Sequence, residues 1–84
     1  LMNSPFVHEQ SRAFARRLLA RMESDQDRIR FAVESALGRS PSDDEVGDFL
    51  KFVERYREQA ARSNVPAEQQ AEHAWSALAR VLLT

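Results

Sequence analysis

The sequence predicts an all-α domain: four helices forming a compact bundle, with no β-sheet. Apolar residues recur at spacings of three and four along four successive segments, which is the spacing of one helix face. The helix-breaking residues Gly38, Pro41 and Pro66 fall between these segments. No segment alternates apolar and polar residues as a half-buried strand does. With 84 residues, of which 43% are hydrophobic, the chain suits one core and a single domain over residues 1–84.

The first helix is expected from about residue 5 to residue 22. Asn3 or Ser4 can cap it, and Pro5 suits the first helical position, where no backbone N–H is required. The apolar residues of its inner face are Val7, Phe14, Leu18 and Met22.

The second helix begins after Ser24, which can cap it, with Asp27 three residues later in a position like that of a capping box. Gly38 ends this helix, and we expect it to have a positive φ. Its replacement by alanine should therefore cost about 1 kcal/mol. The apolar face carries Ile29, Ala32, Val33, Ala36 and Leu37.

The third helix begins after Ser42 and reaches about residue 62. Ser42 and Glu45 form a full capping-box pattern. Gly47 lies inside this helix, where glycine costs about 1 kcal/mol relative to alanine. The close approach of a neighbouring helix would explain that glycine. The apolar face carries Val46, Phe49, Leu50, Val53, Tyr56 and Ala60.

The fourth helix begins near Pro66, and its apolar face carries Ala71, Ala74, Trp75, Leu78 and Leu82. Trp75 and Tyr56 both lie on apolar faces and are expected in the core. Leu78→Ala should cost about 2–5 kcal/mol, as truncation of a buried leucine does. The full expected core is Val7, Phe14, Leu18, Ile29, Val33, Leu37, Phe49, Leu50, Val53, Trp75, Leu78 and Leu82.

The charged residues allow two interpretations of the first helix. A formal net charge of -1 argues against a general polyanion binder or a polybasic membrane anchor. The helix nevertheless carries Arg12, Arg16, Arg17 and Arg21. At helical spacing they form two pairs, the first opposite the apolar face and the second beside it. They form either a solvated face with intramolecular ion pairs, or phosphate contacts of a small nucleic-acid-binding domain.

Catalytic and cofactor chemistry are not expected in these residues. The absence of cysteine excludes disulfides, thiolate metal sites and thiol nucleophiles. The serines lie in no nucleophile-elbow pattern, and no glycine-rich phosphate loop occurs. The sequence therefore predicts that the chain is not an enzyme and has no catalytic residue and no cofactor.

Two groups of residues suggest a metal site, and neither is sufficient. His8 and His73 each neighbour a glutamate, but they lie far apart in the sequence. Asp43, Asp44, Glu45 and Asp48 open a helix and lack the alternation and central glycine of a calcium loop. Helix capping explains the acidic cluster, so no metal site is predicted.

Phe31 is the one candidate interface residue. At 100° per residue it points about 200° away from Ile29, nearly opposite the apolar face of its helix. It is therefore either packed under a second neighbouring helix or exposed as an anchor for another protein segment.

Three stretches carry a family resemblance. They are residues 3–7 (NSPFV), residues 36–45 (ALGRSPSDDE) and residues 75–84 (WSALARVLLT). In this order they resemble the C-terminal end of the planctomycete PSD-type proteins, a large family of unknown function whose members are associated with cytochrome c-like modules. The resemblance implies an exported or cell-envelope location and no particular reaction. The family's Asn-Glu-Phe-containing tail is absent from this sequence.

These observations lead to a functional hypothesis and an alternative. Thr84 directly follows an apolar run, so we expect a segment of a much larger protein. The hypothesis is a non-catalytic structural or interaction module at the C-terminal end of that protein. Its partner would be the remainder of the parent chain, another protein or a second copy, and no apolar run is long enough for membrane insertion. The alternative is the nucleic-acid-binding domain that uses the first-helix arginines.

Overall fold

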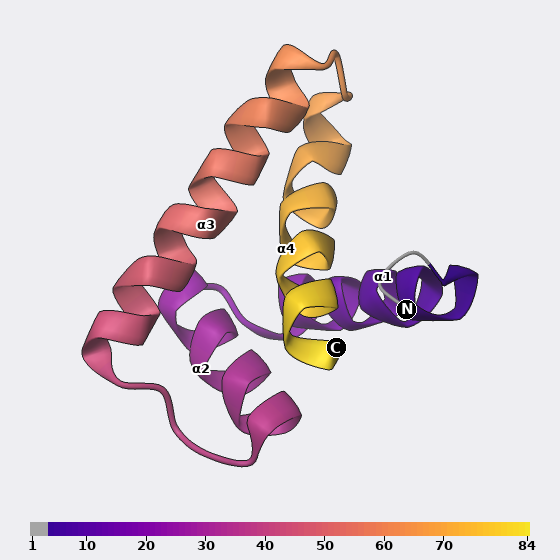
Figure 1. Cartoon of the computed structure of the whole chain (residues 1–84). Coiled ribbons are helices and arrows are strands. Elements are labelled where there is room, and N and C mark those ends of the chain that lie inside the picture. The colour runs from indigo at the N-terminus through magenta and orange to yellow at the C-terminus, as the bar shows by residue number, and fades with distance from the viewer. Residues whose placement is uncertain (1–3) are drawn as a thin grey trace.

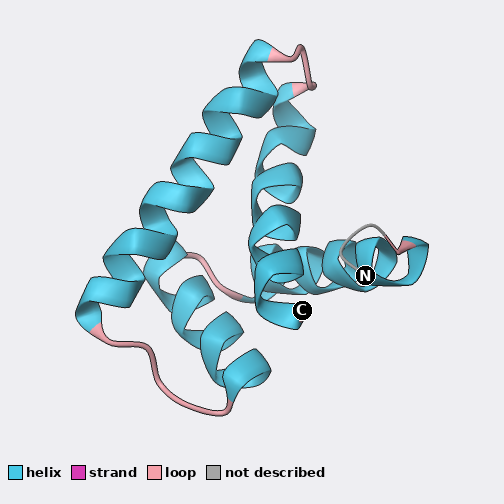
Figure 2. Cartoon of the chain, in the orientation of Figure 1, coloured by secondary structure: helices cyan, strands magenta, loops and turns pink. Residues whose placement is uncertain are grey.

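The computed structural model describes residues 4–84, which form four helices. They are α1 (Pro5–Arg21), α2 (Asp25–Leu37), α3 (Asp43–Arg62) and α4 (Ala67–Leu83). Figure 2 shows them joined by short loops, with no strand in the described part of the chain. The all-α, four-helix prediction is confirmed. None of the helices within residues 4–84 is long and apolar enough to cross a membrane.

Helix α4 is the central element. It packs most extensively on α1 and α3, whereas α2 makes smaller contacts with each of the others. In Figure 1, α3 and α4 are joined at one end and diverge toward the other, α1 crosses α4, and α2 lies beside the open end. The burial pattern of α4 reflects this position, because every residue from 74 to 79 is buried. A helix buried around its circumference must have neighbours on several sides.

The core gathers the large side chains of all four helices around Trp75, which is completely buried. Eight of the expected core residues are buried: Phe14, Leu18, Ile29, Val33, Val53, Trp75, Leu78 and Leu82. Phe49 and Leu50 are half-buried and pack against this cluster, and Val7 is half-buried. The indole N–H of Trp75 has no hydrogen-bond partner among residues 4–84.

The expected burial of Leu37 and Tyr56 is wrong. Leu37 is 47% exposed because it is the last residue of α2, where the neighbouring helices no longer cover it. Tyr56 is 38% exposed, and its ring lies against that of Phe52, with 4.9 Å between the ring centres, at the edge of α3. Both residues lie on the predicted apolar faces, but those faces are wider than the contacts between the helices.

The turn between α2 and α3 follows its sequence signals closely. Gly38 has a φ of 71°, in the left-handed region, as predicted. The Ser42 hydroxyl accepts a hydrogen bond from the N–H of Glu45, and the Glu45 carboxylate accepts one from the N–H of Ser42, which completes the predicted capping box. The Arg39 guanidinium donates to both Glu45 carboxylate oxygens at 2.8 Å. These hydrogen bonds, that from Arg39 first, lower the pKa of Glu45 to about 2.

The acidic cluster at the start of α3 therefore has the structural role predicted for it. Asp43, Asp44 and Glu45 form the first turn of α3, where the partial positive charge of a helix start favours carboxylates. The explanation offered for Gly47 is wrong, however. A Cβ added at Gly47 would meet no atom within 4 Å, so no neighbouring helix approaches it closely.

The start of α1 departs partly from expectation. Pro5 occupies the first helical position as predicted, but Ser4, at the capping position, makes no side-chain hydrogen bond to the helix. The alternative cap, Asn3, lies outside the described residues.

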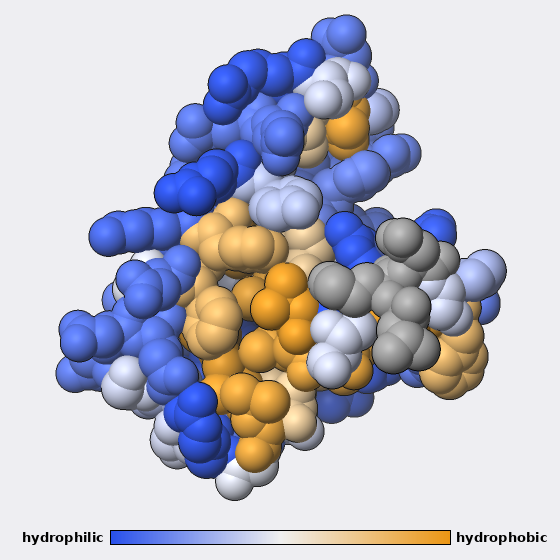
Figure 3. All heavy atoms as spheres, viewed as in Figure 1, coloured by the Kyte–Doolittle hydropathy of each residue, from blue (hydrophilic) through white to orange (hydrophobic). Residues whose placement is uncertain are grey.

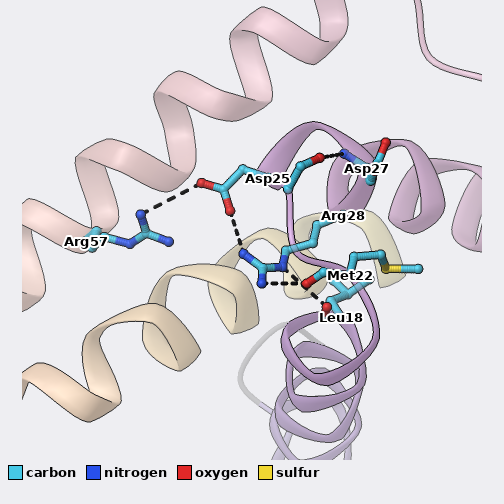
Figure 4. Close-up of polar contacts among 7 residues, drawn as sticks. Leu18, Met22, Asp25, Asp27, Arg28 and Arg57 are labelled. Atoms are coloured by element: carbon cyan, nitrogen blue, oxygen red, sulfur yellow. Dashed lines mark hydrogen bonds and ion pairs between the residues drawn. The ribbon is translucent and has the colours of Figure 1, made fainter.

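An arginine closes the corner between α1 and α2 (Figure 4). The Arg28 Nη2 donates to the carbonyl oxygen of Met22 at 2.6 Å, and Nε donates to that of Leu18 at 3.3 Å. Nη1 lies 2.7 Å from Asp25, whose other carboxylate oxygen faces Arg57 of α3 at 3.9 Å. A positive charge thus sits at the carbonyl end of α1, where the helix dipole favours it. The same corner is capped by Ser24, whose hydroxyl accepts from the N–H of Asp27, as predicted.

Candidate functional site

A groove with a mostly polar lining lies between α1 and α4 and has a volume of about 480 Å³. Its lining residues are His8, Arg12 and Arg16 of α1 and Gln69, Glu72, His73 and Ser76 of α4. The three from α1 are spaced by four positions, and the four from α4 follow the i, i+3, i+4, i+7 pattern, so each set shares one helix face. We call this feature the α1–α4 groove.

The groove contains one ion pair across the two helices. The Nε of Arg16 donates to a carboxylate oxygen of Glu72 at 3.2 Å. The Arg16 side chain is 62% exposed and that of Glu72 only 28% exposed, so the guanidinium reaches over the groove toward a partly covered carboxylate. The prediction of intramolecular ion pairs on this helix is therefore confirmed for Arg16.

A buried hydroxyl also lines the groove. Ser76 is only 4% exposed, in the middle of the fully buried stretch of α4. Its hydroxyl oxygen has no hydrogen-bond partner in the described part of the chain. Buried polar atoms are usually paired, because a lost partner costs about 1–3 kcal/mol. Ser76 is therefore the one buried side chain of the groove that lacks a hydrogen bond.

The fold brings the two histidines into this same groove. Their separation in the sequence had been the reason to treat His8 and His73 as unrelated, yet both line the α1–α4 groove. Within residues 4–84, no three His, Asp or Glu side chains are grouped so that they could hold a metal ion. Each imidazole ring can offer an N–H donor to the groove.

The four arginines of α1 divide into two pairs, as their spacing predicted. Arg12 and Arg16 line the α1–α4 groove. Arg17 instead stacks on the ring of Phe14, with its guanidinium carbon 5.4 Å from the ring centre, and Arg21 is exposed at the end of α1. Arg17 also lines a separate hollow of about 230 Å³, together with residues of α2 and with Leu83.

Apolar side chains are left exposed on α2 and at the end of α4. They are Phe31, Leu37, Val81 and Leu83, and we call this set the apolar corner. Leu83 shares the smaller hollow with Ser35 and Ala36, which shows that the C-terminal ends of α2 and α4 lie together. Phe31 is 36% exposed, so its ring is partly covered by neighbouring residues and partly exposed to solvent. Figure 3 shows apolar atoms gathered between α2, α3 and α4, at the end where α3 and α4 diverge.

Sequence reasoning found part of this arrangement and missed the rest. It named Arg12, Arg16 and Phe31 as candidates but overlooked Glu72 and Ser76. One signal pointed to Ser76, since it is the only polar residue in the otherwise apolar stretch from residue 74 to residue 79. Nothing comparable marks Glu72, because a single glutamate on a helix is ordinary.

Comparison with known proteins gives a family and no further relative. No curated protein and no solved structure matches the chain. The family model of PSD1, described as a protein of unknown function (DUF1553), matches residues 1–53. Two of the three stretches that carry the resemblance, residues 3–7 and 36–45, lie inside this match, whereas residues 75–84 lie beyond it. The match spans more than half of the sequence, and the chain belongs to the PSD1 family of proteins of unknown function (DUF1553).

Proposed function

We propose that the chain is a non-catalytic structural module that packs through its apolar corner against another segment of a longer, exported protein of this family. The observation that carries the proposal is the exposure of Phe31, Leu37, Val81 and Leu83, which is between 36% and 47% for each side chain. Single exposed apolar residues are ordinary, but Leu37, Val81 and Leu83 lie at the C-terminal ends of α2 and α4, which meet at the smaller hollow, and apolar residues exposed at such a junction are typical of a contact surface.

The small size of the apolar corner favours a linked partner over a separate one. Four side chains exposed to this extent offer on the order of 300 Å² of apolar surface. A stable interface between separate proteins buries about 800 Å² on each partner. A segment joined to the module by the same polypeptide needs less area, because linkage gives an effective concentration on the order of millimolar.

The family supports a place in a longer exported protein. The matched region contains the opening residues 3–7 and the turn at residues 36–45, the stretches that resemble the C-terminal end of planctomycete PSD-type proteins. A C-terminal position and export are both part of this proposal.

The nucleic-acid-binding alternative has less support. A phosphate-binding ridge would use Arg12, Arg16, Arg17 and Arg21 together. Arg12 and Arg16 line the α1–α4 groove instead, and Arg17 stacks on Phe14. Micromolar binding to duplex or single-stranded DNA with a steep salt dependence would favour the alternative and overturn the proposed module.

Hydrogen exchange tests the docking directly. Amide exchange is measured on the isolated 84-residue chain and on the same residues within the longer protein that carries them. We expect slower exchange at residues 29–37 and 78–83 in the longer protein, and no change along the outer face of α3. Equal exchange in both samples would contradict the proposal.

A pair of variants gives the matched control. Leu83→Glu should remove the added protection, whereas Phe6→Glu, which also places a charge at an exposed apolar residue, should leave it intact. Sedimentation of the isolated chain should show a monomer at concentrations of about 100 µM, as expected for so small an apolar area. A dimer that Leu83→Glu dissociates would instead identify a second copy as the partner.

A further inference from the structure

We propose that the α1–α4 groove binds a single phosphate group, either as the free ion or carried by a small molecule. This site is separate from the apolar corner and does not depend on its role. Three features of the groove support it: the two guanidinium groups, the unpartnered buried hydroxyl, and the net charge of the lining.

The two arginines lie four positions apart on one face of α1, so their guanidinium groups reach the same groove. Arg16 uses Nε to bind Glu72, and its two Nη atoms have no hydrogen-bond partner among residues 4–84. No hydrogen bond or ion pair within the described residues involves Arg12. Planar guanidinium donors match the oxygens of phosphate closely and bind them in pairs.

The Ser76 hydroxyl supplies the second, independent observation. It is a buried polar group on α4, opposite the arginines, with no protein partner in the described chain. An oxyanion in the groove would accept a hydrogen bond from this hydroxyl and relieve the cost of its burial. His8 and His73 add ring N–H donors from the two helices.

The charge of the lining limits the ligand to a small anion. The lining contains two guanidinium groups and one carboxylate, that of Glu72. Its net charge is therefore positive but small. The whole chain has a formal net charge of -1, which disfavours a long polyanion at any surface. A volume of about 480 Å³ accommodates a phosphate with a modest organic group attached.

The test is a titration with inorganic phosphate, followed by the NMR shifts of the backbone amides at constant ionic strength. We expect saturable shifts that are largest at residues lining the groove, with chloride producing none. The double variant Arg12→Gln/Arg16→Gln should weaken binding by about tenfold or more, because it removes hydrogen bonds to a charged group. The matched variant Arg17→Gln/Arg21→Gln changes the net charge equally and should alter the affinity by less than about twofold.

Two single variants test roles that a merely structural residue would not have. Glu72→Gln removes the opposing carboxylate and should tighten phosphate binding by several fold. Ser76→Ala should weaken it by about threefold, the loss expected of one hydrogen bond, while raising the melting temperature of the phosphate-free chain, because it removes a buried hydroxyl that has no partner within the described residues. Equal losses in the two arginine double variants would show nonspecific charge attraction and would overturn the proposal.

A second titration distinguishes the free ion from a phosphate carried by a small molecule. Titration with glycerol phosphate in place of inorganic phosphate distinguishes a ligand that carries an organic group from the free ion, and tighter binding of either one supports the site. A duplex oligonucleotide that binds more tightly than both and depends on all four arginines would contradict a single-phosphate site.

Discussion

The turn between α2 and α3 and the contact between α1 and α4 are stabilised in opposite ways. The turn is held by hydrogen bonds among residues that are close in the sequence, from Gly38 to Glu45. The α1–α4 contact instead joins distant residues through buried apolar side chains, with Leu18 and Trp75 both fully covered. The turn fixes the direction in which the chain continues, whereas the contact removes large side chains of both helices from water.

This difference should appear in the energies. A cap or a left-handed glycine contributes about 1 kcal/mol, whereas burying a large side chain contributes several times as much. The same contact also creates the α1–α4 groove, so stability and the candidate site depend on one interface. The turn carries no such site and should tolerate change more readily.

The largest effect is expected at Trp75. Trp75→Ala should lower the free energy of unfolding by about 3–5 kcal/mol, because it leaves a large cavity in the core. Trp75→Phe should cost clearly less, because its phenyl ring refills most of that cavity, whereas both variants remove the indole N–H that has no hydrogen-bond partner among residues 4–84. Urea unfolding followed by far-ultraviolet circular dichroism measures both. Equal losses in the two variants would contradict this account of the core.

Arg28 offers an intermediate case, because its side chain joins the end of α1 to α2, and its partner Asp25 also faces Arg57 of α3. Arg28→Ala should cost about 1–3 kcal/mol, since the carbonyl oxygens of Leu18 and Met22 lose their donor and Asp25 loses its nearest partner. Arg30→Ala is the matched control, because Arg30 makes just one long ion pair, at 3.8 Å, with the exposed carboxylate of Asp43. Its effect should stay within about 0.5 kcal/mol in thermal unfolding. A loss of stability in Arg30→Ala as large as that in Arg28→Ala would show that the hydrogen bonds of Arg28 between α1 and α2 are not the cause.

The two glycines should respond with opposite signs. Gly38→Ala should destabilise the chain by about 1 kcal/mol, because its φ of 71° strains any residue with a Cβ. Gly47→Ala should stabilise it by up to about 1 kcal/mol, since Gly47 lies inside a helix and an added Cβ meets no atom within 4 Å. Chemical denaturation of the two variants side by side checks the pair. A loss of stability at Gly47 would mean that some other constraint acts there.

The smallest effect concerns pH at the turn. Because the hydrogen bonds from Arg39 and, second, from the Ser42 N–H lower the pKa of Glu45 from 4.5 to about 2, the ionised carboxylate stabilises the folded state. That contribution is complete above about pH 4.5 and is lost as the pH falls toward 2. Melting temperatures of the wild type and Arg39→Gln should therefore differ near neutral pH and converge in acid. A difference that persists unchanged at pH 2 would exclude Glu45 as its origin.

The turn could be predicted from the sequence because its causes are local. Gly38, Ser42 and Glu45 act on backbone groups within three positions of themselves, so a single sequence contains all the required information. The four helices could be predicted for the same reason, because their apolar spacing and capping residues are also local features of the sequence. Apolar spacing also identified most of the core, but it could not show where neighbouring helices end, which is why Leu37 and Tyr56 were misplaced.

The α1–α4 groove could not be predicted, because it depends on how two distant helices face each other. Arg16 and Glu72 are separated by 56 positions, and no local pattern links them. The polar side of α1 was expected to face solvent, and the histidines were set aside for their separation. Only the packing of α1 across α4 brings Arg12, His8 and His73 to one surface. The apolar face of α4 indicated that other helices pack against it, but it did not indicate which helices these are.

Native-state hydrogen exchange on the isolated chain compares the two regions in one measurement. The account predicts that the amides of residues 75–79 exchange only through global unfolding, so that their exchange free energy equals the value from urea denaturation. The amides of residues 38–40 and of Ser42 should exchange through local opening with a smaller free energy. Exchange of residues 75–79 by local opening, with the turn protected to the global limit, would contradict the claim that the α1–α4 contact is the stable centre of the molecule.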